Sequence, residues 1–148
     1  MRYLPDGQKW LDFFAGLYEL YRRSGVPPAL EKFRDEAFAE PDRQGMAAVR
    51  ARDPKQGKYL LANATYWFEH ELRQYPAVHL DLDALMKEAD RIVLAAGRES
   101  HGYPAHEASV ELGHKLGRDV IELPGGHLGH VTQPVRFADE LVSSLGAG

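Results

Sequence analysis

The first half of the chain carries apolar side chains at the three- and four-residue spacing of amphipathic helices. The pair Ser24-Gly25 stops the first of these helices, and Pro27-Pro28 opens a second one, after which Pro41 is expected to break the chain. The first helix is predicted from one broad apolar stripe: Trp10, Leu11, Phe13, Phe14, Leu17, Tyr18, Leu20 and Tyr21.

Two further helices and a short capped one are expected before residue 90. A short helix is predicted over 46–52, and Asp53-Pro54 starts a longer helix. Asp81 is placed to cap a short helix that ends at Leu85. The larger side chains of the longer helix share one face: Tyr59, Leu60, Asn63, Tyr66, Trp67 and His70.

The second half of the chain alternates between strand and helix. The apolar run 92–96 is typical of a strand buried on both faces. A helix over 104–116 with Gly117 at its C-terminus, a strand over 120–123 and a helix from Pro134 follow. Two strands joined by a helix imply a parallel crossover, so the sequence predicts an α/β fold for this half.

The composition narrows the class of protein. The 148 residues are 44% hydrophobic and 27% charged, as in ordinary globular proteins, and suit one core. A net charge of −4 without a basic cluster argues against nucleic acid as a partner. No cysteine, membrane-spanning stretch or signal peptide is present, so we expect no membrane partner and a cytoplasmic location.

The strongest chemical signal is the run LPGGHLGH at 123–130. His127 follows the predicted strand 120–123, and catalytic groups in open parallel sheets gather beyond the carboxyl ends of the strands. Glycines let this loop turn sharply, and an imidazole there can exchange protons near neutral pH. The alternative is a surface histidine in a glycine-rich turn.

Glu99 occupies the matching place after the preceding strand. It is therefore expected to project over the same sheet edge as His127, where a carboxylate orients an imidazole and stabilises its protonated form. The alternative is a solvated loop acid, or an acid near the start of a helix.

Two segments carry a resemblance to the α/β-hydrolase family. The phrase IELPGGHLGHVTQPVRFADEL (121–141) is similar to the last strand, histidine loop and final helix of that family, and RIVLAAGRES (91–100) resembles its penultimate strand and acid turn. The resemblance implies a helical cap over residues 1–80, followed in 81–148 by the C-terminal β-α-β-α portion of the parallel sheet.

The resemblance also implies a function and site residues. His127 matches the general base and Glu99 the acid of a hydrolase acting on a small apolar ester or related bond, and no cofactor is expected. From the aromatic cap, Phe14, Tyr66 and Trp67 are the residues expected to bind substrate. The nucleophile motif Gly-x-Ser-x-Gly is absent from this sequence, so the nucleophile must come from elsewhere.

The remaining histidines suggest metal binding only weakly. His101, His106 and His114 follow one another over a short stretch, and His127 and His130 are three residues apart. The latter pair lacks a third ligand, so we predict no metal site from the sequence.

A fold with only two parallel strands implies a partner. Two strands are too few for a stable sheet, and an apolar strand edge recruits another chain. We therefore expect a homo-oligomer or a complementing N-terminal half. A second interpretation is a non-catalytic oligomeric α/β module that only binds a ligand or itself.

Overall fold

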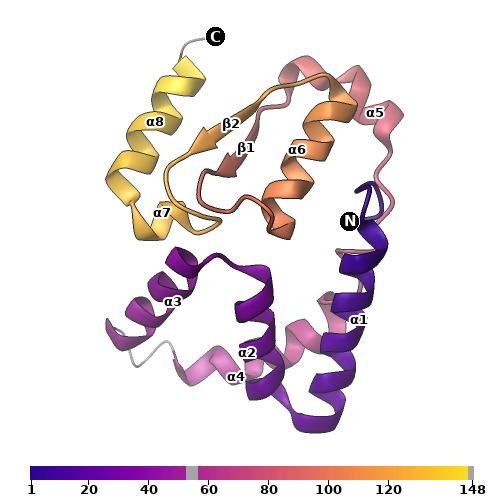
Figure 1. Ribbon diagram of the computed structural model, residues 1–148, viewed down its shortest axis with the longest axis vertical. Helices are drawn as coiled ribbons and strands as arrows, with labels where there is room; N and C mark the ends of the chain where they lie inside the picture. Colours follow the sequence, from indigo (N-terminus) through magenta and orange to yellow (C-terminus); the bar gives the residue numbers. More distant parts are fainter. Residues whose placement is uncertain (53–56, 147–148) are drawn as a thin grey trace. The chain divides into compact units, whose positions relative to one another are not determined.

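The chain is mostly helical, and its described residues include a small parallel sheet (Figure 1). The computed structural model describes the backbone of residues 1–52 and 57–146. It describes the side chains of the same residues except those at 49–58. The predicted α/β class is confirmed in this general sense. None of the helices in the described residues has both the length and the apolar character that crossing a membrane requires.

The chain divides into two compact units. The first combines residues 1–36 with 46–80, and the second combines residues 37–45 with 81–148. Residues 37–45 therefore belong with the C-terminal part of the chain, although they lie inside the region 1–80 that the resemblance assigned to a helical cap.

The first two helices begin and end close to their predicted positions. Helix α1 (Gly7–Ser24) ends at Gly25, whose φ of 80° is a conformation that glycine adopts without strain. Helix α2 (Val26–Ala37) carries the predicted proline pair in its first turn, where a missing N–H does not interrupt a helical hydrogen bond.

Pro41 lies in the first turn of a new helix, just after the end of α2. Helix α3 (Glu40–Arg52) contains the predicted segment 46–52 and begins six residues earlier than expected. The second helix does end before Pro41, at Ala37, so the predicted break is confirmed, but the start of the third helix was placed too late because proline is also tolerated in the first turn of a helix. The predicted start of the next helix at Asp53-Pro54 lies outside the described residues.

The buried face of the following helix is not the apolar face that the sequence predicted. Helix α4 (Gly57–Tyr66) continues into a π-helical turn, η2 (Trp67–Glu71), where the N–H of Leu72 donates to the carbonyl of Trp67 at 2.8 Å. The buried positions here are spaced four apart, at Ala64, Phe68 and Leu72. Most of the predicted face is exposed, including Tyr59, Leu60 and Tyr66.

One hydrophobic core holds the first unit together. Phe68 and Leu17 are fully buried, and the ring of Tyr21 stacks on that of Phe68 with centroids 4.8 Å apart. Burying each large apolar side chain contributes about 1.5–3 kcal/mol. The buried cluster comprises Phe14, Leu17, Val26, Ala29, Ala64, Phe68 and Leu72.

The second unit contains the sheet. Strands β1 (Leu94–Gly97) and β2 (Val120–Leu123) pair in parallel, with Leu94 opposite Val120 and Gly97 opposite Leu123. The predicted parallel pair is thus confirmed, but β1 is not buried on both faces, because Ala95 is exposed. Both strands end at the same edge of the sheet.

Helices cover the two strands and join them. Helix α6 (Pro104–Leu116) connects β1 to β2 with the predicted bounds, and α8 (Pro134–Gly146) follows β2. Figure 1 shows these two helices on opposite sides of the strands. Shorter elements complete this unit: α5 (Leu82–Lys87), capped by Asp81 as predicted, the 3-10 turn η3 (Ala89–Arg91), and α7 (Gly129–Thr132), which was not predicted.

Candidate functional site

The turns that follow β1 and β2 are hydrogen-bonded to each other. The N–H of Arg98 donates to the carbonyl of Leu123, and the N–H of Glu99 donates to the carbonyl of Gly125, both at 2.9 Å. Parallel strands end at one edge of a sheet, so the backbone segments that carry Glu99 and His127 are held together there.

Glycines make this close approach of the two turns sterically possible. A Cβ atom on Gly97 would lie 2.0 Å from the carbonyl oxygen of Gly126, well inside van der Waals contact. Gly125 has a φ of 84°, a left-handed conformation that strains other residues. The glycine-rich run that the sequence analysis singled out thus serves backbone contact as well as turning.

A buried aspartate holds the histidine loop. Asp42, which is fully buried, accepts a hydrogen bond from the backbone N–H of His127 at 3.0 Å and one from Leu128 at 2.7 Å. A Cβ atom on Gly126 would lie 2.3 Å from the same carboxylate, so a larger residue there would displace it. Asp42 therefore positions the histidine loop through hydrogen bonds from the backbone N–H groups of the loop to its carboxylate.

Sequence reasoning missed Asp42. The two amides that it binds are 85 and 86 residues away along the chain, so no local pattern connects them. The available signal was an acid in the first turn of α3, a position favourable for negative charge, but Pro41 was taken as a break instead.

The side chain of His127 is exposed and borders a small cavity. Its ring lies beside that of Phe38, with centroids 5.6 Å apart. The cavity has a volume of about 170 Å³, and its polar lining comes from Ser100, His106, Ser109 and His127. An imidazole placed here is open to a reacting group that approaches from solvent.

The carboxylate of Glu99 does not contact His127 in the described part of the chain. Its Oε1 accepts a hydrogen bond from Nε2 of Gln133 at 3.0 Å, just before α8. Glu99 is exposed, so its side chain has room to adopt other rotamers. The structure thus brings the two backbone segments together but leaves the acid bonded to an amide.

The three residues expected to bind substrate occupy different environments. Phe14 is buried in the core of the first unit. Trp67 packs against that core, with its ring 4.8 Å from Phe33 and 5.0 Å from Phe68. The ring of Tyr66 is mostly exposed and lies 4.7 Å from that of His70.

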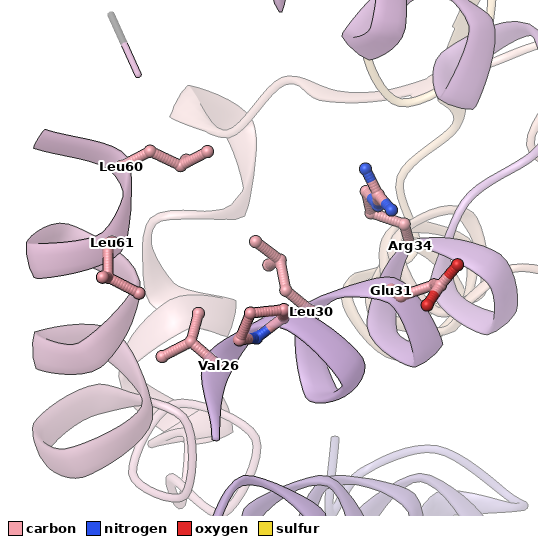
Figure 2. Close-up of a pocket in the computed structure, with 7 residues that line it drawn as sticks. Val26, Leu30, Glu31, Arg34, Leu60 and Leu61 are labelled. Atoms are coloured by element: carbon pink, nitrogen blue, oxygen red, sulfur yellow. The ribbon is translucent and has the colours of Figure 1, made fainter. Parts of the chain in front are cut away.

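The first unit also contains an apolar groove between α2 and α4. It has a volume of about 350 Å³, and Figure 2 shows Leu60 and Leu61 on one side, with Val26 and Leu30 facing them. Arg34 also lines it. None of the residues expected to bind substrate is among the lining residues of this groove.

Two of the remaining histidines meet at a carboxylate on β2. Nε2 of His101 lies 2.9 Å and Nε2 of His106 lies 3.2 Å from Oε1 of Glu122. The hydrogen bond from His106 is the largest cause of a lowered pKa of Glu122; burial opposes it, and the hydrogen bond from His101 lowers the pKa further. His114, which the sequence grouped with this pair, pairs instead with Glu111.

None of the known protein-family models matches this chain. The resemblance to α/β hydrolases therefore depends on the two segments quoted above.

Proposed function

We propose that this chain is the C-terminal portion of an α/β hydrolase acting on a small apolar ester or related bond. In this proposal His127 is the general base and Glu99 is the acid that orients it. The nucleophile comes from outside these residues, because the sequence contains no nucleophile motif.

One contact supports the proposal most directly: the hydrogen bond from the N–H of Glu99 to the carbonyl of Gly125. It ties the turn after β1 to the loop after β2, two residues before His127. A base and its orienting acid must share one sheet edge, and this backbone contact meets that requirement.

The exposure of His127 is also consistent with a base that serves an external nucleophile. The imidazole lies at a cavity edge while its backbone is held by the buried Asp42. A rigid backbone with an accessible side chain lets the ring reach a hydroxyl or water without losing its position.

The proposal requires the carboxylate of Glu99 to leave Gln133. The hydrogen bond between them is solvent-exposed, so a charge-assisted bond from an imidazolium to Glu99 can replace it. Gln133 is then a competitor for the acid, and its removal favours the catalytic pairing.

The test begins with the protein purified from its own source through a C-terminal tag. Native mass spectrometry shows whether a longer chain or a partner carries a nucleophile elbow, and p-nitrophenyl esters of increasing acyl length measure hydrolysis. We expect His127→Ala to lower the turnover by about 100-fold or more, which is typical for loss of a general base.

The matched control is His130→Ala, three residues along the same loop, whose ring lies against Phe137. It should leave turnover unchanged. If His127→Ala and His130→Ala behave alike, the assignment of the base is wrong. A smaller loss in Glu99→Ala than in His127→Ala is expected, because an orienting acid acts through the histidine.

A second candidate function is a non-catalytic module that assembles with itself. It is favoured by the exposed apolar face of α8, where Val135, Val142 and Leu145 are 72%, 69% and 53% exposed. A homodimer of this chain without hydrolase activity, in protein from its own source, would favour the module over the enzyme.

A further inference from the structure

Two histidines and a glutamate converge in the second unit. His101 lies in the turn after β1, His106 in the first turns of α6, and Glu122 on β2. The ligand atoms of the three side chains all lie within 4.8 Å of one another. Their elements meet through the parallel crossover, so the cluster joins residues 21 positions apart along the chain.

The spacing of these atoms suits a small divalent cation. Zinc binds nitrogen and oxygen ligands at about 2.0–2.2 Å in a tetrahedron, which separates the ligand atoms by about 3.3 Å. The two histidine nitrogens lie 2.9 and 3.2 Å from the same oxygen of Glu122. A metal ion can therefore enter the triangle after small movements of the side chains, of which His101 is exposed.

His106 provides an independent reason for a cation. Its side chain is 4% exposed, and its Nδ1 is buried without a hydrogen-bond partner, 3.4 Å from Oε1 of Glu107. That oxygen accepts a hydrogen bond from the N–H of Gly102 at 3.1 Å, which holds it in place.

Neither neutral tautomer of His106 satisfies both neighbours. With the proton on Nε2, the lone pair of Nδ1 points toward the Glu107 carboxylate. With the proton on Nδ1, the lone pair of Nε2 faces the carboxylate of Glu122 instead. A cation bound at Nε2 removes this conflict, because Nδ1–H is then free to turn toward Glu107, the outer carboxylate that metal-bound histidines usually have.

We propose that His101, His106 and Glu122 bind a divalent transition-metal ion such as Zn²⁺, with Glu107 supporting His106 from the second layer. Two histidines and one glutamate form a recurring zinc ligand set that leaves the fourth position for water or another ligand. This site does not depend on the proposed hydrolase function, since neither His127 nor Glu99 belongs to it.

The test is a titration of the metal-free chain with Zn²⁺, followed by isothermal calorimetry, and with Co²⁺, followed by visible absorption. We expect one ion per chain and the intense absorption of four-coordinate cobalt. His101→Ala and Glu122→Gln should each weaken zinc binding by about 10-fold or more, and Glu107→Gln by about 10-fold, as is typical for an outer partner.

The matched control is His114→Ala, which removes an exposed histidine from the same helix but outside the cluster. It should bind zinc as the wild type does. His101 is exposed, so His101→Ala keeps the test valid even if a variant at the buried His106 fails to fold. Lack of stoichiometric binding by the folded wild type, a six-coordinate cobalt spectrum, or equal losses in His101→Ala and His114→Ala would each overturn the site.

Discussion

Asp42 shows how one buried side chain organises the histidine loop. Its carboxylate accepts two backbone hydrogen bonds from the loop, and Gly126 leaves room for it. A buried carboxylate is stable only when such donors surround it, so the aspartate and the loop conformation depend on each other. His127 was predictable from its glycine-rich surroundings, whereas Asp42 was not, because its partners are remote along the chain.

We expect Asp42→Ala to release the histidine loop. Two buried N–H groups would lose a charged acceptor, at a cost of at least about 2 kcal/mol, or about 30-fold in local opening. Hydrogen exchange followed by NMR should show faster exchange at the amides of His127 and Leu128 by that factor. Asp139→Ala, an exposed position on α8, is the control and should change neither amide. Unchanged protection in Asp42→Ala would remove the aspartate from its positioning role.

At the scale of elements, caps and breaks were predicted well and helix faces less well. The bounds of α6 follow from Pro104 at its start and Gly117 at its end, where φ is 61°. The face of α4 was misjudged because its exposed side, with Tyr59 and Leu60, is as apolar as its buried side. Periodicity locates an apolar stripe but does not tell which of two apolar stripes is covered.

A hydrogen bond between α1 and η2 leads us to predict how the ionisation of Tyr21 and the stability of the chain depend on pH. The hydroxyl of Tyr21 donates to Oε1 of Glu69 at 2.7 Å, and this bond raises the pKa of Tyr21 above its ordinary value of 10.0. A raised folded pKa means that the stabilisation is complete below about pH 10 and is lost as the pH rises through the folded value.

Absorbance at 295 nm during alkaline titration should therefore include a late tyrosine ionisation, above the ordinary pKa of 10.0, that belongs to Tyr21. Tyr21→Phe should remove this late step, and Glu69→Gln should move it toward lower pH. The control is Tyr75→Phe, an exposed residue, which should leave the late step in place. If the late step persists in Tyr21→Phe, the hydrogen bond does not govern this titration.

At the scale of the whole molecule, the second unit exposes surfaces that normally lie inside an α/β protein. Its sheet has two strands, which is below the number that is usually stable alone. On α8, Val135, Val142 and Leu145 recur at helical spacing and are exposed, and Val93 beside β1 is 53% exposed. These surfaces support the prediction that the chain associates with another copy or with a complementing half.

We expect the isolated chain to sediment as a dimer or larger species. Val142→Lys should shift it toward the monomer without changing its helical circular dichroism, because the charge interrupts the apolar stripe of α8. Ser143→Lys, which adds the same charge one position along, is the control and should leave the association intact. A monodisperse wild-type monomer across the micromolar range would contradict this prediction.

The sequence by itself determined the end of α1, the start of α2, the bounds of α6, the parallel strand-helix-strand order and the loop that carries His127. These features depend on local chemistry: proline and glycine dihedrals, apolar periodicity and the short range of capping hydrogen bonds. Only the tertiary structure decided that Asp42 holds the histidine loop, that Glu99 bonds to Gln133, and that His101 and His106 meet at Glu122. Each of these contacts joins residues far apart in sequence, and their geometry is set by how the elements pack.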